Sequence, residues 1–550
     1  MPGPSLNQFL ANIRSSVLPS SSFKPYPGIV SYIPVLGNAS CDLDSFVSAT
    51  TFAFLLSYPR LGRAGAGDDG RKTPSSLPLY VPILNLPSVS SRDLWRLRPE
   101  FGTALRLASD RLRAAPQEVE LQESEIEKEL LGSLVTIEDV RLDQSSPFHD
   151  IFTVSSSTTG KSKQPVILVD HNALDIALPD VSVEVLRGRL ETIGCIDHHE
   201  AEGAVPATAS PCIIKPGIGS CTTLIVQYLK EQDFWAHLIQ WSLSDQNAID
   251  DADPSSLAVV QLAKLSLAAI LIDTSNLTAE SKVSALDREI VAFLEDVVTT
   301  SCTSNKNADG SNDIRWDKEA FYNDIAQSKA DALALLTLPE ILARDYKTWT
   351  DVAPTPSSPE VSSARSLKLG ISSITEPIDW LLHHQASSSE LDQALELWQA
   401  AQHFARKEHL DILVLMTAFS ANDGDVGAKG RNRHEIKNSF RRELCIVPFT
   451  RDDDNDSTKN IDSRNESARN KTVATTSTAS ATVQAFERLA THELGLQPWI
   501  SSSSSAKYFR KQLQNHNQGR ARVYTQKEVS KSRKQVAPLL RQAMREALAV

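Results

Sequence analysis

The feature that most constrains this chain is a set of apolar segments that each end close to an aspartate. The segments, with the acids that follow them, are Gly28–Leu36 with Asp42 and Asp44, Val166–Val169 with Asp170, Thr192–Ile196 with Asp197, and Leu267–Ile272 with Asp273. Because the carboxyl ends of parallel strands line one crevice of a doubly wound sheet, we expect these acids to converge there. The pattern leaves open whether Leu267–Ile272 is a strand or a helix, and either would bring Asp273 to that crevice.

Helical spacing of apolar residues separates these segments. It is found at Arg98–Arg113, Cys221–Lys230, Val283–Val298 and Leu391–Ala405, and a further buried strand is predicted at Ile412–Met416. Alternating strands and helices predict an α/β fold, with a mostly parallel sheet flanked by helices and a smaller α/β C-terminal domain.

The length of 550 residues exceeds what one hydrophobic core supports. We predict a metal-binding domain at 20–336 and a substrate-binding domain at 337–550, with the active site in the cleft between them. Polar stretches without apolar periodicity are predicted to be loops or disorder. They are Arg60–Pro78, Gln144–Gln164, Ser301–Asp313, Val352–Ala364 and Arg451–Thr482.

Charge and cysteine content narrow the class of protein. The net charge of −12 argues against a nucleic-acid or membrane-surface binder. From Ser505 to Val550, however, the chain contains eleven Lys or Arg residues and only two acids, which gives a local charge of +9. The six cysteines include no CxxC pair and suit a reducing compartment, and no segment is apolar enough to span a membrane.

The N-terminal residues show no basic segment followed by an apolar one, so we do not expect secretion. We predict a capping helix at Leu6–Val17 and a cytoplasmic location. The alternative is mitochondrial import, because no acid precedes Asp42 and serines are frequent before it.

Converging carboxylates repel one another unless cations lie between them. Asp42, Asp44, Asp170 and Asp273 with one imidazole form an oxygen-rich set that suits Mg²⁺ or Mn²⁺. Two such ions about 3.5–4 Å apart can share a carboxylate and activate a water for attack on a phosphoryl group. A single aspartate after a strand is more often a helix cap, but capping does not explain four of them together with two histidines.

In these motifs the chain resembles the DHH phosphoesterases. The matching motifs are DxDS at Asp42–Ser45, LVDHN at 168–172, DHH at Asp197–His199 and ILIDTSN at 270–276. Residues 345–347, 442–444 and 532–535 resemble the second domain shared by family II inorganic pyrophosphatases and fungal exopolyphosphatases, and the motifs together are most similar to the fungal exopolyphosphatases.

The resemblance implies a role for each motif residue. Asp42 and Asp170 would bind one divalent cation; Asp44, Asp170, His198 and Asp273 would bind the other. Mg²⁺ is favoured and Mn²⁺ is possible. Asp197 would orient the site, and His199 would contact substrate phosphate and protonate the leaving oxygen as a general acid. The alternative for His199 is a supporting role without proton transfer.

Asn38 departs from the family pattern, in which many members have a histidine ligand at this position. As a ligand, asparagine would offer a neutral oxygen that favours Mg²⁺ over Mn²⁺. The alternative is that Asn38 is a turn residue after Gly37.

Two regions are predicted to bind phosphate. The Gly217–Thr223 segment precedes a helix, so Ser220 and its neighbouring amides would either cradle an anion or cap the helix. In the basic C-terminal region, Ser532, Arg533 and Lys534 would bind phosphate together with Arg442. The alternative for such a charge run is a solvated surface.

We therefore expect an exopolyphosphatase that releases orthophosphate from the ends of inorganic polyphosphate, with no obligate protein partner. The alternatives are an inorganic pyrophosphatase, a DHH nucleotide phosphodiesterase, and a polyphosphate-binding scaffold without turnover. The phosphodiesterases usually carry a GG-rich substrate loop, and this chain contains no Gly-Gly pair.

Overall fold

The protein is described from a computed structural model, in which the chain divides into two compact units. Unit 1 covers Met1–Leu333 and unit 2 covers Ala334–Val550. The structure describes residues 5–19, 31–61, 78–109, 119–154, 162–178, 180–246, 258–280, 282–302, 316–352, 366–384, 389–421, 439–449, 466–501, 503–516 and 520–549.

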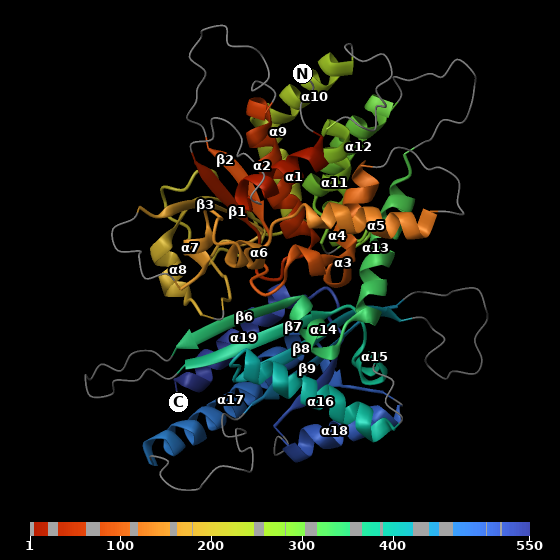
Figure 1. The fold of residues 1–550 in the computed structure, drawn as a ribbon. Helices are drawn as coiled ribbons and strands as arrows, with labels where there is room; N and C mark the ends of the chain where they lie inside the picture. The colour runs from red at the N-terminus through yellow and green to blue at the C-terminus, as the bar shows by residue number, and fades with distance from the viewer. Residues whose placement is uncertain are drawn as a thin grey trace, which may run out of the picture. The chain divides into compact units, whose positions relative to one another are not determined.

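The sheet of unit 1 is parallel throughout (Figure 1). Its strands are β1 (Tyr32–Leu36), β2 (Leu79–Ile83), β3 (Gln164–Val169), β4 (Leu190–Asp197) and β5 (Cys212–Ile214), in the order β2-β1-β3-β4-β5. This order reverses between β1 and β3, and ligands bind at such a switch point, outside the carboxyl ends of the strands. The strand order therefore directs attention to the residues that follow β1 and β3.

The helices of unit 1 pack around this sheet. They are α1 (Leu6–Val17), α2 (Leu43–Leu61), α3 (Leu94–Leu97), α4 (Pro99–Ser109), α5 (Val119–Gly132), α6 (Ile137–Leu142), α7 (His149–Phe152), α8 (Val183–Arg189), α9 (Cys221–Glu231), α10 (Phe234–Gln246), α11 (Ala258–Asp273), α12 (Ala285–Cys302) and α13 (Lys318–Leu335). The segment left open above, Leu267–Ile272, lies in α11. This helix is buried nearly all round, so it shows no amphipathic period that would distinguish it from a buried strand.

The N-terminal helix α1 is part of the core of unit 1. Ser5 and Gln8 form a capping box at its start, and the backbone amide of Leu6 donates to the side chain of Gln261 in α11. Phe9 is fully buried and packs edge-on against Phe54, with ring centroids 5.0 Å apart. The predicted helix at Leu6–Val17 is confirmed.

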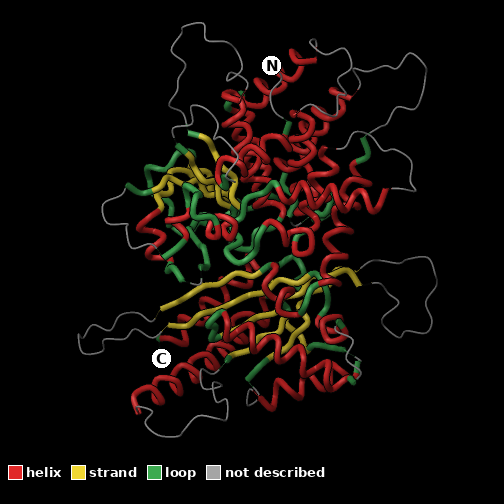
Figure 2. The backbone as a smooth tube through the Cα atoms, viewed as in Figure 1, coloured by secondary structure: helices red, strands yellow, loops and turns green. Residues whose placement is uncertain are grey.

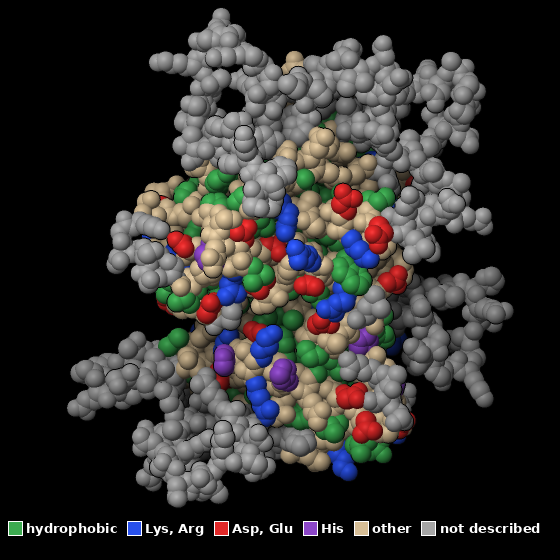
Figure 3. All heavy atoms as spheres, in the orientation of Figure 1, with side chains coloured by type: hydrophobic (Ala, Val, Ile, Leu, Met, Phe, Trp, Pro, Cys, Tyr) green, Lys and Arg blue, Asp and Glu red, His purple; other side chains and the backbone are tan. Residues whose placement is uncertain are grey.

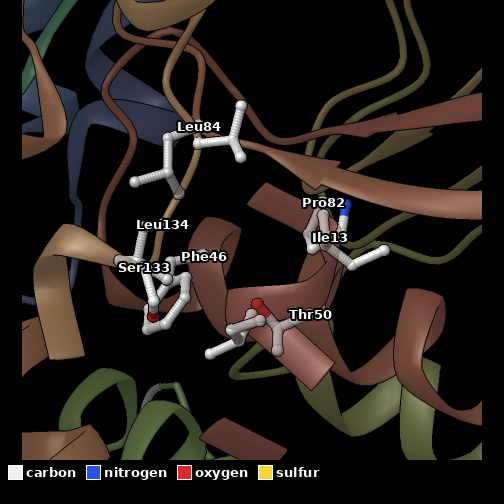
Figure 4. A pocket seen from close by; sticks show the side chains of 9 residues that line it. Ile13, Phe46, Thr50, Pro82, Leu84, Ser133 and Leu134 are labelled. Atoms are coloured by element: carbon white, nitrogen blue, oxygen red, sulfur yellow. The ribbon is translucent and has the colours of Figure 1, made fainter. Parts of the chain in front are cut away.

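A small cavity of about 10 Å³ lies between α1, α2 and β2 (Figure 4). Apolar side chains, among them Ile13, Phe46 and Leu84, make up most of its lining, and the hydroxyl of Thr50 also borders it. At this size the cavity holds at most one water, so it is a packing defect and not a ligand site.

Unit 2 contains a mixed sheet of six strands (Figure 2). They are β6 (Tyr346–Val352), β7 (Ser366–Ile374), β8 (Ile412–Ala421), β9 (Ser439–Pro448), β10 (Leu496–Pro498) and β11 (Arg522–Gln526), in the order β10-β11-β9-β8-β7-β6. Only the β7–β8 pair among these described strands is parallel. The helices are α14 (Leu338–Arg344), α15 (Ile378–His383), α16 (Glu390–Lys407), α17 (Glu466–Glu493), α18 (Ser504–His516) and α19 (Arg533–Leu548).

The predicted disordered insertion at 451–482 is wrong in its second half. Residues 450–465 lie outside the described part of the chain, but α17 begins at Glu466. Ala479 and Val483 belong to the core of unit 2, and the hydroxyl of Thr482 donates to the carbonyl of Thr478 one turn earlier. Small Ala and Thr side chains make close packing possible without the large apolar residues that would show a helical period.

Residues 62–77, 303–315 and 353–365, which make up most of three other predicted insertions, also lie outside the described residues. The fourth, Gln144–Gln164, contains the short helix α7. Within the described residues, no helix has the length and apolar character needed to cross a bilayer.

Candidate active site

Asp170 lies at the switch point of the sheet, directly after β3. Its backbone has a φ of +62°, and its carboxylate is almost fully buried. One oxygen, Oδ2, accepts hydrogen bonds from Asn38 Nδ2 and Ser45 Oγ, both at 2.6 Å. The other, Oδ1, faces His198 Nε2 at 3.2 Å. Residues that follow β1 therefore hold Asp170 in place and leave Oδ1 directed at the histidine.

The tautomer of His198 follows from its second partner. Nδ1 lies 3.0 Å from the carbonyl oxygen of Ile218, which can only accept, so Nδ1 carries a hydrogen. In the neutral imidazole Nε2 then has a lone pair, and this lone pair faces the carboxylate of Asp170. Two acceptors at 3.2 Å repel each other unless a proton or a metal cation lies between them.

Asp44 is held by the N-terminus of α9. Its Oδ1 accepts from Ser220 Oγ at 2.7 Å and from the amide and hydroxyl of Thr222 at 2.9 and 2.7 Å. Its Oδ2 accepts from the amide of Cys221 at 2.6 Å and lies 4.0 Å from His198 Nε2. Because a carboxylate oxygen has two lone pairs, Oδ2 retains one on the side of the histidine.

Asp42 and Asp273 complete the group of carboxylates. Asp42 caps α2, with Oδ1 accepting from the amide of Ser45 at 3.0 Å. Asp273 is the last residue of α11, and no described residue donates a hydrogen bond to its carboxylate. It is electrostatically coupled to Asp44, Asp42 and Asp170, with the ammonium of Lys329 acting in the opposite sense.

Burial and mutual repulsion raise the pKa values of two of these acids. Burial, followed by repulsion from Asp42, raises the pKa of Asp170 to about 7. Burial and the charges of Asp44 and Asp42 raise the pKa of Asp273 well above its ordinary value. Raised values of this kind show that the cluster is short of positive charge, which a divalent cation would supply.

The remaining DHH residues form a chain of hydrogen bonds. Asn172 Nδ2 donates to Asp197 Oδ2 at 2.6 Å, and Asp197 Oδ1 lies 2.7 Å from His199 Nδ1. Burial acts to raise the pKa of Asp197, but the contacts with His199, the charge of His198 and the hydrogen bond from Asn172 outweigh it and lower the pKa. The arrangement fixes the ring of His199 through its Nδ1.

Asn38 is placed differently from the prediction that it binds metal. Its Oδ1 accepts from the amides of Ser40 and Cys41 at 2.9 and 3.1 Å and from Ser40 Oγ at 2.6 Å. Backbone amides only donate, so the side chain cannot be turned over, and Nδ2 is the atom that faces Asp170. Its oxygen stabilises the turn after β1, as the alternative reading expected, and its nitrogen orients a carboxylate.

Ser220 is also placed differently. It is fully buried and donates to Asp44, so the anion cradled by the Gly217–Thr223 segment is a carboxylate of the chain itself. Its side chain makes no capping hydrogen bond to α9, so neither predicted role describes its contacts. We therefore assign Ser220 to the support of Asp44 and not to substrate binding.

Unit 2 brings its predicted phosphate-binding residues to the start of α19. Ser532 caps this helix in a capping box with Gln535, and Lys534 is exposed in its first turn. Arg442 Nε donates to the carbonyl of Val529 at 2.7 Å, in the turn that leads to the helix. Burial lowers the pKa of Arg442 to about 10, and no described carboxylate pairs with it.

Several cations of the basic C-terminal region form ion pairs within unit 2. Arg533 pairs with Asp345 at 2.8 Å, Arg522 with Glu487 at 3.0 Å, and Arg541 with Asp351 at 3.0 Å. On the face drawn in Figure 3, acidic and basic side chains of the described residues are interspersed. Ion pairing therefore offsets part of the local charge of +9.

The donor set fits divalent cations. Ligand atoms of Asp170, His198 and His199 lie within 4.8 Å of one another, with Asp42, Asp44 and Asp273 coupled to the group. Carboxylate oxygens with one imidazole are typical of Mg²⁺ and Mn²⁺ sites.

Comparison with known proteins defines the class to which this chain belongs. The model of the DHH family, N-terminal domain, matches residues 32–253, and the model of the DHHA2 domain matches residues 323–543. The chain belongs to the DHH family and is a hydrolase of the two-domain type that carries a DHHA2 domain.

One relative and two solved structures show similarity over most of the chain. A Schizosaccharomyces pombe protein named "Putative exopolyphosphatase" is 26% identical over 424 residues, which cover 76% of this chain and 81% of the relative. A Methanococcus jannaschii structure described as a "putative family II inorganic pyrophosphatase" has a TM-score of 0.35 and 16% identity, covering 70% of this chain and 84% of that one. An exopolyphosphatase-related protein from Bacteroides fragilis has a TM-score of 0.32 and 10% identity, covering 89% and 93%.

Sequence reasoning missed the residues that support the predicted ligands. Asn172 stands inside the LVDHN motif, but only Asp170 of that motif received a role. The contacts of Cys221 and Thr222 with Asp44 span 177 and 178 positions of the chain. Only the proximity of Asn172 to Asp170 offered a signal; the long-range contacts offered none.

Proposed function

We propose that this chain is a metal-dependent exopolyphosphatase that hydrolyses terminal phosphoanhydride bonds of inorganic polyphosphate and releases orthophosphate. The observation that carries the proposal is the approach of His198 Nε2 to Asp170 Oδ1 within a group of buried carboxylates, an arrangement that calls for a cation. The choice of polyphosphate is supported by the printed name of the 26% identical relative and by the sequence motifs.

The acidic and histidine residues of unit 1 are proposed to bind two cations. Asp42 and Asp170 would hold one cation, and Asp44, Asp170, His198 and Asp273 the other. Bound divalent cations supply an activated water and neutralise charge on the phosphoryl group. Mg²⁺ is the proposed ion, because it prefers oxygen ligands and usually keeps several waters.

His199 is proposed as the general acid. Asp197 holds its Nδ1 and stabilises the imidazolium, so Nε2 can deliver a proton to the leaving phosphate oxygen. Arg442 and Lys534 are proposed to bind substrate phosphate, with Ser532 at the same helix start. Arg533 would have to exchange its ion pair with Asp345 to take part.

A cytoplasmic location is part of the proposal. The described cysteines, including exposed Cys212, are free, as a reducing compartment would keep them.

The decisive experiment compares orthophosphate release in Mg²⁺ from long-chain polyphosphate, tripolyphosphate, pyrophosphate and a short oligonucleotide. Asp170→Ala serves as the inactive variant, and Asp143→Ala, a partly exposed aspartate after α6, as the matched control. We expect rapid release from polyphosphate by the wild type and Asp143→Ala, and none by Asp170→Ala.

Other results would revise the proposal in defined ways. Preference for pyrophosphate would keep the metal site and replace the substrate. Release from the oligonucleotide alone would indicate a phosphodiesterase. Polyphosphate binding without any release would indicate a scaffold, and activity that survives Asp170→Ala would contradict the metal site.

A further inference from the structure

The Gly217–Thr223 segment contacts two of the proposed metal ligands. The carbonyl of Ile218 lies 3.0 Å from His198 Nδ1 and fixes the tautomer that turns Nε2 toward Asp170. Ser220 Oγ and the amides of the next two residues donate to the carboxylate of Asp44. The position of this one segment therefore sets the position of ligand atoms from two different parts of the chain.

The same segment also passes close to Thr274, the residue directly after a third proposed ligand, Asp273. A Cβ atom on Gly219 would lie 2.7 Å from Thr274 Cγ2 and 3.0 Å from the carbonyl oxygen of Lys282. Glycine is required here because the backbone passes close to the end of α11. A shift of the segment would therefore also displace Thr274 and, with it, Asp273.

A single buried carboxylate, Asp287 of α12, anchors this segment. Its Oδ2 accepts from the amide of Gly219 at 2.9 Å, and its Oδ1 accepts from Thr223 Oγ1 at 2.7 Å. Oδ2 also accepts from the amide and hydroxyl of Ser284 at 2.7 and 2.6 Å, which ties it to the start of its own helix. Asp287 and Thr223 are fully buried.

We infer that Asp287 is a positioning residue of the metal site, acting through the 217–223 segment on His198, Asp44 and Asp273. The inference rests on the proposed metal centre and extends it to a residue outside the family motifs. Groups that hold metal ligands in place typically change metal affinity about 10- to 100-fold when they are removed. Asp287 does not itself contact the ligands, so its effect on metal binding should be transmitted by the 217–223 segment.

The test measures Mn²⁺ binding to the metal-free full chain by titration calorimetry, with the electron paramagnetic resonance signal of free Mn²⁺ as a second readout. In Asp287→Asn, the new amide group faces either the Gly219 amide, which cannot accept, or Thr223 Oγ1, which must then accept instead of donate; in both cases the carboxylate charge that holds the segment is lost. We expect the Mn²⁺ Kd to rise about 10- to 100-fold.

The matched control is Asp139→Asn in α6. Asp139 is also a buried carboxylate that closes a capping box and accepts from Ser90, but none of its described contacts reaches a proposed ligand. This variant should lose thermal stability and keep the Mn²⁺ Kd of the wild type.

A second pair of variants decides the question if Asp287→Asn fails to fold. Thr223→Val keeps the shape of the side chain and removes the hydroxyl, whereas Thr223→Ser keeps the hydroxyl and removes a methyl group. We expect Mn²⁺ affinity to fall in Thr223→Val and to be retained in Thr223→Ser, whatever the order of their melting temperatures.

Unchanged Mn²⁺ affinity in both Asp287→Asn and Thr223→Val would overturn the inference and leave Asp287 a helix cap. So would an affinity that falls in the Asp139→Asn control as much as in Asp287→Asn. A wild type that binds no Mn²⁺ or Mg²⁺ would overturn the metal centre itself, and this result is distinct because it appears without any substitution.

Discussion

Two buried acceptors that face each other define this site at the scale of single residues. His198 Nε2 and Asp170 Oδ1 are 3.2 Å apart, and the carbonyl of Ile218 prevents the imidazole from changing tautomer without losing a hydrogen bond. Asn38 and Ser45 donate hydrogen bonds to Asp170 Oδ2. The carboxylate therefore cannot rotate Oδ1 away from His198 without losing these hydrogen bonds. The site is therefore built for a cation through the orientation of neutral neighbours as well as through charge.

Removal of these neighbours should weaken metal binding. In Asn38→Ala, Asp170 Oδ2 loses one donor and the turn at Ser40 and Cys41 loses its acceptor. We expect the Mg²⁺ Kd, measured by titration calorimetry, to rise about 10-fold or more. Ser45→Ala removes the other donor and should act in the same direction; an unchanged Kd in both variants would contradict this role.

A substitution at Thr50 should stabilise the protein. Thr50 Oγ1 is buried beside the small cavity of Figure 4 and has no hydrogen-bond partner among the described residues. Thr50→Val keeps the shape and removes an unsatisfied polar atom, so the free energy of unfolding should rise by about 1 kcal/mol. Urea denaturation would measure the change, and a loss of stability would indicate that the hydroxyl has a water partner.

The buried acid Glu443 in β9 should make stability depend on pH. Burial raises the pKa of Glu443 above its ordinary 4.5, although hydrogen bonds from Ile378, Trp499 and Thr417 oppose the shift. From pH 4.5 up to the raised pKa, the folded protein holds the proton more tightly than the unfolded chain. The free energy of unfolding should therefore be highest below this range and fall as the pH rises through it.

The measurement is chemical denaturation of the wild type and Glu443→Gln between pH 4 and 8. The variant cannot titrate at this position. As the pH rises, the free energy of unfolding of the wild type should therefore fall relative to that of Glu443→Gln. A difference that is constant over this range would show that Glu443 has an ordinary pKa.

The proximity of Asp170 and His198 was predicted from sequence, but the residues that hold the proposed ligands in place were not. Strand ends and motif order suffice to bring Asp170 and His198 together, because parallel strands end on one edge of the sheet. The hydrogen-bond partners of Asp44 could not be predicted in this way, because Ser220, which donates to it, lies 176 positions further along the chain. Asp287 gave only a local signal, because Ser284-x-x-Asp287 has the spacing of a capping box.

At the scale of elements, helix α1 makes a testable contribution to the core. Phe9 is fully buried and contacts Phe54 of α2. Phe9→Ala should lower the free energy of unfolding by about 3–5 kcal/mol, the usual cost of truncating a buried phenylalanine. Urea denaturation would show the loss, and exposed Tyr508→Ala in α18 should change stability little.

Two elements show where pattern reading ends. Helix α11 has apolar residues on every side, so neither a period of 3.6 nor one of 2 could be detected. Helix α17 was missed for a different reason. Its first half consists mainly of small and polar residues that show no apolar period, although residues such as Ala479 are buried. Amphipathic helices such as α9 and α16, which have one polar face, were predicted within about two residues of their ends.

At the scale of the whole molecule, each unit has its own core. One cluster of buried apolar side chains extends from Leu6 to Ile325, and another from Leu367 to Leu548. We therefore expect two transitions in differential scanning calorimetry of the full chain.

Mg²⁺ should distinguish the two transitions. The proposed ligands all lie in unit 1, so Mg²⁺ should raise the midpoint of one transition by mass action and leave the other unchanged. In Asp170→Ala neither midpoint should move. A single transition that shifts as a whole would contradict independent unfolding of the units.

The distance along the chain between the two sides of the site also affects when it can form. Asn38 and Asp170 are 132 residues apart, and they meet only because β1 and β3 are neighbours in the sheet. Closing a loop of this size is among the slower events in folding, since the entropy of the intervening chain is lost before the contacts are gained. The proposed cation-binding cluster thus forms together with the central strand pair, and a nascent chain that ends before β3 lacks the proposed metal site.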